Sequence, residues 1–473
     1  MCLQNNTMKK KHISLAVMLA SVIGVSGCSS AQLNNRQDLN LPDSYISDLK
    51  INQNINGINQ LSIEWWLNFN DPAMTNLIER SLENNSDILK AVARIEQANA
   101  LSRVIETAEV PNVELKTSGT RSKANDQAKG NQVSNTFSAS LSSAFEIDFW
   151  GKLHHETEAA RAQTLATTYA AEVVRQTIAT QVAQTYLKLL TTDLQIELTQ
   201  RNIQSYIENY KLQQLKFTQG QIGQLELKQA EIQQIDANVQ LKELKQQQSL
   251  LISKLSVLAA DPLIDLSQRA KSLPETPAYP ALGVPSELLS RRPDVRQAEQ
   301  QLIAANSKIQ VAEAARLPSF SLISSGGGES ATLKNLLSNP SEVWSFGPSI
   351  DVPIFDSGRR RAAVEQAIAE RKAAEADYRS AVYVALQDVS DALTNIKFAD
   401  SSQADTEAKL QAATIALSLS NARYDAGYSS FSEVLEAERT VNSSEMQLLN
   451  NRQAQLIAMI DLFKSLGGGW SST

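Results

Sequence analysis

Hydrophobic and polar residues alternate with a period of two in four short segments of the chain, near 111–120, 136–149, 318–326 and 343–355. In the second of them, Phe137, Leu141 and Phe145 fall on one face, and serines fall on the other. Such alternation over ~10 residues is typical of a strand with one apolar face. The length also matches a transmembrane β-strand of ~9–11 residues. The alternation alone leaves open an ordinary half-buried sheet in a soluble domain.

The stretches between these segments favour helices. A first pair of helices is expected over Ser86–Ala108 and Pro293–Arg316. A second, much longer pair follows, because Lys152–Gln219 and Arg359–Ala426 contain neither Gly nor Pro. A seven-residue spacing of apolar side chains along both long stretches predicts coiled-coil packing. Gly220 and Gly427 should end the long helices, and a returning helix follows each glycine.

The two halves of the chain repeat each other at a constant offset of 207 residues. Residues 87–119 match residues 294–326 at 11 of 33 positions without a gap, where composition alone gives roughly two or three. We therefore predict a duplicated unit of helix, strand, strand, long helix and helix. The first repeat spans 86–260, a Pro-rich connector spans 261–292, the second repeat spans 293–466, and 467–473 form a C-terminal tail.

Four strands cannot close a barrel, and lipid does not tolerate an open sheet edge. If the strands span a membrane, several chains must share one barrel, and three chains supply twelve strands. The expected fold class is thus mainly α with membrane β, in which a barrel is continued by a helical tube. Asp148 and Asp351 lie on the polar strand faces, where they either line the pore or are simply solvated.

The first residues have the features of an export signal. Three lysines precede an apolar run of about 15 residues, which ends at Val25-Ser26-Gly27-Cys28. This motif resembles the bacterial lipobox, so we expect a signal peptide over 1–27 and a lipidated segment over 28–85 attached through Cys28. Ser29 is typical of outer-membrane sorting. Translation starts at either Met1 or Met8, and a plain signal peptide with an incidental cysteine is the alternative.

Composition removes several other function classes. The chain has a net charge of −7 and no basic region of the kind that nucleic-acid binding requires. Its mean hydropathy of −0.25 excludes a polytopic helical membrane protein. With two Cys and three His, and no nucleophile or phosphate-loop motif, we expect no catalytic residues, cofactor or metal, and therefore no enzyme. His154 and His155 are adjacent and so point to different sides of a helix.

The resemblance to a known family rests on several segments: FEIDFWGKL at 145–153, RRPDVRQAEQQLIAANSKIQVAEAARLPSFSL at 291–322, PIFDSGRRRA at 353–362, RYDAGYSSFSEVLEAER at 423–439 and LGGGW at 466–470. The sequence resembles the TolC-like outer-membrane efflux family, in its lipoprotein branch, over essentially the whole mature chain. The resemblance implies a homotrimer with a twelve-stranded barrel in the outer membrane and a periplasmic helical tunnel. It also implies a periplasmic adaptor and a proton-driven inner-membrane transporter as partners.

The resemblance further implies a periplasmic gate beyond the second tip glycine. In the pattern Tyr-x-x-Gly with acidic residues six and nine positions after the glycine, the matching residues are Tyr424, Gly427, Glu433 and Glu436. Ser429 stands where a well-known member has Arg, which puts an inter-chain lock through that position in doubt. A solvated helix face is the alternative for the two glutamates. Adaptor docking is expected at the tips, which contain Gly220, Gly223, Gly427 and Ser429, although simple helix capping also explains the glycines.

Three functions remain in view. The leading one is a passive outer-membrane channel of a tripartite efflux pump. A type I protein-secretion exit duct has the same architecture. A periplasmic coiled-coil adaptor or structural lipoprotein is the third, but two helical hairpins that are each flanked by membrane-length strands argue against it.

Overall fold

The computed structural model describes residues 63–470, apart from 127–129, 281, 283–284 and 339–340. The expected signal peptide and Cys28 lie outside the described residues.

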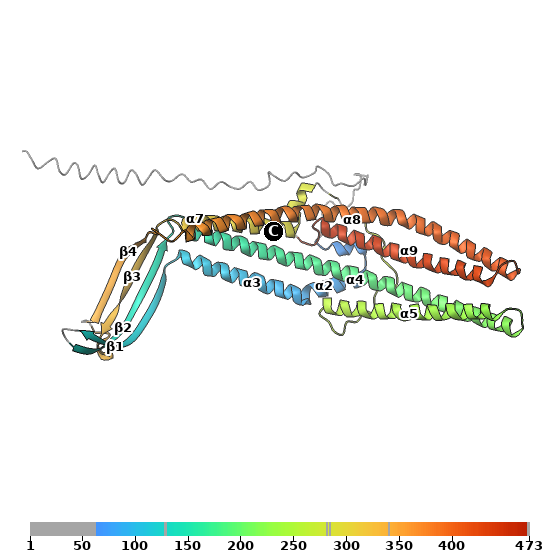
Figure 1. The fold of residues 1–473 in the computed structure, drawn as a ribbon, viewed down its shortest axis with the longest axis horizontal. Helices are drawn as coiled ribbons and strands as arrows, with labels where there is room; N and C mark the ends of the chain where they lie inside the picture. Colours follow the sequence, from blue (N-terminus) through green and yellow to red (C-terminus); the bar gives the residue numbers. More distant parts are fainter. Residues whose placement is uncertain (1–62, 127–129, 281, 283–284, 339–340, 471–473) are drawn as a thin grey trace, which may run out of the picture. The chain divides into compact units, whose positions relative to one another are not determined.

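Two copies of one unit make up most of the described chain (Figure 1). The elements of the first copy are α3 (Ser86–Glu106), β1 (Asn112–Asp126), β2 (Gly130–Ile147), α4 (Lys152–Thr218) and α5 (Gln224–Leu258). Those of the second are α7 (Pro293–Ala314), β3 (Ser319–Ser330), β4 (Glu342–Asp351), α8 (Arg359–Asp425) and α9 (Phe431–Ser465). Corresponding helices begin 207 residues apart, and α4 and α8 both have 67 residues. The expected duplicated, mainly helical fold with a small β part is confirmed.

The remaining elements are short. The 3-10 helices are η2 (Trp65–Phe69), η3 (Thr107–Glu109), η4 (Pro285–Glu287) and η5 (Leu333–Asn335), and the short α-helices are α2 (Pro72–Asn84) and α6 (Leu288–Arg291). Of these, η2 and α2 were not expected from the sequence. Both pack on the main core, where the Trp65 ring stacks on Phe463 of α9 with centroids 6.0 Å apart. Asp71 caps α2 by accepting from the backbone N–H groups of Ala73 and Met74.

The helix α3 begins at Ser86, as expected, and Asn85 caps it. The carboxamide oxygen of Asn85 accepts from the N–H groups of Asp87 and Ile88. Asparagine is as good an N-cap as serine. In the second repeat Arg292 holds the same position, and Pro293 begins the helix as expected.

The four strands form one antiparallel sheet in the order β1-β2-β3-β4. The first hairpin is longer than predicted: its ladder reaches Asp126 and Gly130, so much of the stretch between the strands expected near 111–120 and 136–149 is itself strand. Polar side chains misled the pattern analysis there, because ladder pairing needs only backbone groups. The fourth strand ends earlier than expected, at Asp351 rather than near 355. Pro353, which cannot donate to a ladder, follows closely.

Two glycines end the long helices in the same way. Gly220 and Gly427 have φ of +72° and +77°. In the second tip the N–H of Gly427 donates to the carbonyl of Tyr424, and the N–H of Tyr428 donates to that of Arg423. This pair of bonds is a Schellman motif, and the first tip has the equivalent pair. Each long helix can therefore reverse within a few residues into α5 or α9.

Gly427→Ala should lower the local stability of the second tip by about 1 kcal/mol, the cost of a left-handed conformation for a residue with a Cβ. An added Cβ at Gly427 meets no atom within 4 Å, so the φ angle alone causes the loss. Hydrogen exchange of the amides at the tip measures the effect. Gly427→Asn is the control, because asparagine also adds a Cβ but visits the left-handed conformation far more readily than alanine does. Equal exchange in both variants would contradict the argument.

The connector between the repeats is fastened to the helices by polar contacts. Arg269 donates to both carboxylate oxygens of Asp193 on α4, at 2.6 and 3.2 Å. The hydroxyl of Tyr279 donates to Asp400 on α8 at 2.6 Å. The N–H of Ala270 donates to the hydroxyl of Tyr186, which is itself buried in the core. The connector thus ties together helices that belong to different repeats.

Candidate functional site: the channel-forming surfaces

The sheet has one apolar face, and its register places this face continuously across all four strands. Leu115 lies opposite Leu141, Leu141 opposite Gly326, and Gly326 opposite Trp344. The next row towards the helices contains Val113, Ser143, Ser324 and Phe346. These side chains are exposed in the single chain: Leu115 is 67% exposed, Leu141 56% and Trp344 77%. An exposed apolar surface of this kind marks an interaction site.

The opposite face of the sheet is mainly polar, although Ile323 and Val343 also lie on it. Serine hydroxyls pair across the strands, Ser118 with Ser138 at 2.8 Å and Ser325 with Ser345 at 2.8 Å. Asp351, the last residue of β4, falls on this face with Ser345 and Ser349. Alternation between an apolar outer face and a polar inner face is the pattern of transmembrane barrels.

Asp148 has a different place from the one we expected. The strand β2 ends at Ile147, and the carboxylate of Asp148 accepts from the backbone N–H of His154 in the first turn of α4 at 2.8 Å. A carboxylate is favourable there because the first N–H groups of a helix lack partners. Asp148 therefore lies beyond the strand and bonds the first turn of α4, whose N-cap position is held by Gly151. It still lines, with Asp351, a cavity of about 310 Å³ where the strands meet the helices.

The sheet and the row of helices each have two open edges. In the sheet, β1 and β4 each pair on one side only among the described residues. The helices of one row lie in the order α3, α4, α7, α8, and those of the continuing row lie in the order α5, α4, α9, α8. The helices α3 and α5 are therefore at one edge, and α8 is at the other. The chain thus exposes β1 and α3 at one edge, and β4 and α8 at the other.

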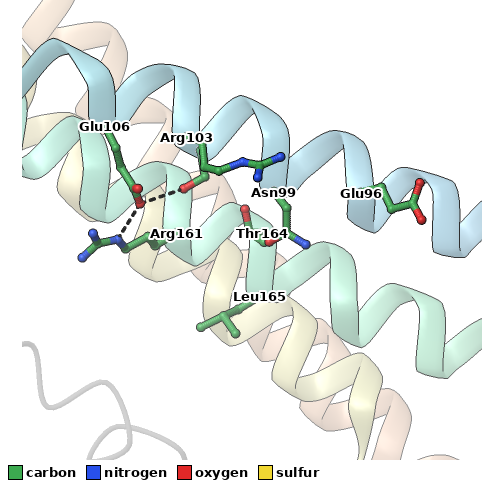
Figure 2. A pocket seen from close by; sticks show the side chains of 8 residues that line it. Glu96, Asn99, Arg103, Glu106, Arg161, Thr164 and Leu165 are labelled. Carbon is green, nitrogen blue, oxygen red and sulfur yellow. Dashed lines mark hydrogen bonds and ion pairs between the residues drawn. The ribbon is translucent and has the colours of Figure 1, made fainter.

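A groove runs between α3 and α4 at one of these edges (Figure 2). Its volume is about 840 Å³. Across it, the Arg161 guanidinium of α4 donates to the Glu106 carboxylate of α3 at 2.9 Å. The Ser102 hydroxyl, also on α3, donates to the same oxygen at 3.4 Å. The other lining residues are Glu96, Asn99, Arg103, Thr164 and Leu165.

The two glutamates near the second tip lie in different surroundings. Glu433 is in the first turn of α9, and its carboxylate lies 3.5 Å from the Arg423 guanidinium of α8. Glu436 is exposed one turn later, and no ion-pair partner for it occurs among the described residues. Arg423 begins the segment 423–439, and nothing in the sequence pattern indicates a role for it. Arg423 and Glu433 are ten residues apart in the sequence, and only the helical hairpin brings their side chains together.

Tyr424 joins the two repeats. Its hydroxyl donates to the side-chain carbonyl of Gln213 on α4 at 3.2 Å, and the Lys216 ammonium lies 4.8 Å from the centre of its ring. A cation over a tyrosine ring is attracted by the ring's quadrupole. The ring also meets Phe431, with centroids 5.5 Å apart. Gln213 and Lys216 were missed because nothing in the sequence pairs a residue of one repeat with a residue of the other.

The tips themselves are short. Gly223 is the N-cap of α5, and Ser430 holds that place for α9. The Ser429 hydroxyl is buried and has no hydrogen-bond partner within the described part of the chain. Adaptor docking at these tips stays a prediction.

A partly buried acid lies on the same hairpins, further from the tips. Glu438 of α9 accepts from Gln233 of α5 at 2.6 Å, and burial raises the pKa of its carboxyl. Burial also raises the pKa of the neighbouring Tyr206, which lies with Gln233 at a cavity of about 260 Å³. These contacts join α4, α5 and α9, and so add a second polar link between the repeats.

None of the helices in the described ranges is both long enough and apolar enough to cross a membrane.

Comparison with known proteins agrees with this architecture. A family model described as outer membrane efflux protein matches residues 77–258 and 284–468. The chain is 32% identical over 412 residues to the solvent efflux pump outer membrane protein SrpC of Pseudomonas putida. The matched region covers 85% of this chain and 87% of SrpC. It is 30% identical over 467 residues to the outer membrane protein OprJ of Pseudomonas aeruginosa, across 96% and 95% of the two chains.

A solved structure of the outer-membrane channel OprN superimposes with a TM-score of 0.83 at 26% identity, over 91% of this chain and 99% of OprN. These matches confirm the resemblance seen in the sequence and the expected function as an outer-membrane efflux channel. The chain therefore belongs to the outer membrane efflux protein family.

Proposed function

We propose that three copies of this chain form one passive conduit of a tripartite efflux pump. Their sheets join into a twelve-stranded barrel in the outer membrane, and their helices form a tunnel in the periplasm. The observation that carries the proposal is the two-faced sheet with two unpaired edges, since such a sheet is stable in lipid only inside a closed barrel. Twelve strands lie within the range of known barrels.

One head-to-tail contact closes both layers. The edge with β1 and α3 on one copy meets the edge with β4 and α8 on the next, and a threefold rotation closes the ring. In this arrangement α8 of a neighbouring copy packs along the groove between α3 and α4. The contact covers the exposed apolar residues of both edges, such as Leu101 and Val104 on α3 and Phe398 on α8.

The cellular setting follows from the sequence features and the relatives. Cys28 carries the lipid anchor, which holds the chain in the outer membrane. The helical tips dock on a periplasmic adaptor, and a proton-driven inner-membrane transporter supplies energy, since nothing in the sequence binds nucleotide. SrpC is named for solvent efflux, which supports small-molecule export over protein secretion.

Purified protein tests the proposal. In detergent the mass of the particle should correspond to three chains, and in planar bilayers it should conduct ions. Cys28→Ala should abolish labelling by radioactive palmitate, without loss of conductance once the protein is purified. A monomer that does not conduct would overturn the channel, and palmitate labelling of Cys28→Ala would overturn the anchor alone.

The gate is proposed to contain two rings of carboxylates, from Glu433 and from Glu436. Three like charges around one axis repel one another and attract cations. Because Arg423 compensates Glu433 within each chain, Glu436 should hold divalent cations more strongly. We expect Glu436→Gln to reduce block by a divalent cation in single-channel recordings by more than Glu433→Gln does. Unchanged block in both variants, and in the double variant, would remove the assignment.

A further inference from the structure

The first hairpin extends beyond the apolar part of its lipid-facing surface. Across β1 and β2 the apolar face runs from Ile147 to the pair Gly119 and Phe137. The same face then continues with Arg121, opposite Asn135, and Lys123, opposite Val133. Both basic residues are exposed. Neither has an ion-pair or hydrogen-bond partner among the described residues.

The register settles which face these side chains share. Ser122 lies between them and points to the opposite, polar face, where its hydroxyl meets that of Ser134 at 3.0 Å. Side chains alternate along a strand, so Arg121 and Lys123 point away from that face, to the side of Leu115 and Phe137. Lys116, by contrast, lies on the polar side, where its ammonium is 3.2 Å from Glu114.

The dimensions of the strand place the two residues at a definite depth. From Ile147 to Phe137 is ten residues, which at ~3.3 Å each and a tilt of ~40° span ~25 Å, the height of the apolar band of an outer-membrane barrel. The next positions on this face lie ~5 and ~10 Å further out. That is the level of the headgroups, which extend ~5–8 Å beyond the hydrocarbon on each side. The long Lys123 side chain can reach back to it.

We propose that Arg121 and Lys123 form a binding site for the phosphates of lipid A in the outer leaflet. The inference rests on the proposed function, because that function places the hairpin end of the sheet, away from the helices, at the cell exterior. Three observations favour this occupant: the site continues the lipid-facing surface, it lies at headgroup depth, and its charge complements phosphate. A guanidinium and an ammonium are the side chains that best bind phosphate oxygens. A trimer carries three such sites.

The test is a titration of delipidated, detergent-purified trimer with diphosphoryl lipid A, followed by native mass spectrometry. Arg121→Gln and Lys123→Gln should each weaken binding by about fivefold, and the double variant by about thirtyfold. Lys116→Gln is the matched control, since it removes one positive charge from the same strand but from the other face. It should bind lipid A as the unchanged protein does.

Separate outcomes overturn this inference and the proposed function. Unchanged lipid A binding in the double variant overturns the site, as does an equal loss in Lys116→Gln. Equal binding of phosphatidylglycerol and lipid A at the site also overturns it, because the occupant is then any anionic lipid. All variants should still conduct in planar bilayers. A protein that neither trimerises nor conducts refutes the channel itself, whichever lipid it binds.

Discussion

Leu141→Arg is expected to abolish assembly of the channel. Leu141 lies on β2, within the band of apolar side chains and between Leu115 of β1 and Gly326 of β3. It is 56% exposed in the single chain, and in the trimer it faces hydrocarbon. An arginine on the lipid face near the bilayer midplane costs ~2–4 kcal/mol. Three copies in one barrel raise the cost to ~6–12 kcal/mol, comparable to the whole stability of a typical protein.

The neighbouring residue supplies the control. Ser142 lies on the polar face, opposite Glu114 and Ser325, so Ser142→Arg adds the same charge to the water-filled side. Heat-modifiable migration of the trimer on gels, with and without protease, compares the two. We expect folded trimer for Ser142→Arg and none for Leu141→Arg. Folded trimer in both would mean that the apolar face does not meet lipid.

The assignment of these faces was available from the sequence, because alternation along a strand is a local property. Phe137, Leu141 and Phe145 were placed together before any register was known, and the ladder keeps them on one face. The ends of the strands were not available in the same way. Residues such as Ser122 and Ser134 carry no apolar signal, and only the backbone ladder shows that they belong to strands.

The duplication made most of the helical fold predictable. An offset of 207 residues relates α4 to α8 and α5 to α9, and the same offset relates the two glycine tips. The duplication could not show how the first repeat packs against the second repeat within one chain. The contacts of Tyr424 with Gln213 and Lys216 join helices from different copies, and they depend on a packing that no periodicity encodes. Asp148 was expected on the strand for a different reason: the alternation of apolar and polar residues continues past Ile147, where β2 ends.

The motif RRPDVR was recognised from its resemblance to the family, and the structure shows what its second arginine does. The Arg292 side chain is 8% exposed. Its guanidinium donates to both carboxylate oxygens of Asp294, at 3.0 and 2.6 Å, and to Asp388 of α8 at 2.8 Å. The backbone carbonyl of Ser465 at the end of α9 lies 3.4 Å away. One buried cation therefore connects α7, α8 and α9, where the short and long helices of the second repeat meet.

Arg292→Ala should lower the free energy of unfolding of each chain by about 2–3 kcal/mol. Removing one partner of a buried ion pair costs ~3–5 kcal/mol, and the figure is reduced here because Asp294 and Asp388 remain 33% and 44% exposed. Hydrogen exchange of the α7 and α8 amides measures the loss. Arg292→Lys should be intermediate, because a lysine keeps the charge but cannot bridge both carboxylates with a planar fork.

The control for Arg292→Ala is an arginine of the same region that lies at the surface. Arg361 of α8 is 81% exposed and pairs with Glu365 one turn away, so Arg361→Ala should change the free energy by less than about 0.5 kcal/mol. If the cost at Arg292 comes from uncompensated charge, combining Arg292→Met with Asp294→Asn and Asp388→Asn should recover much of it, because neither asparagine leaves a negative charge without its cation. Stability in the combined variant no better than in Arg292→Ala would show that the guanidinium acts through its contacts with the carbonyls of α8 and α9 instead.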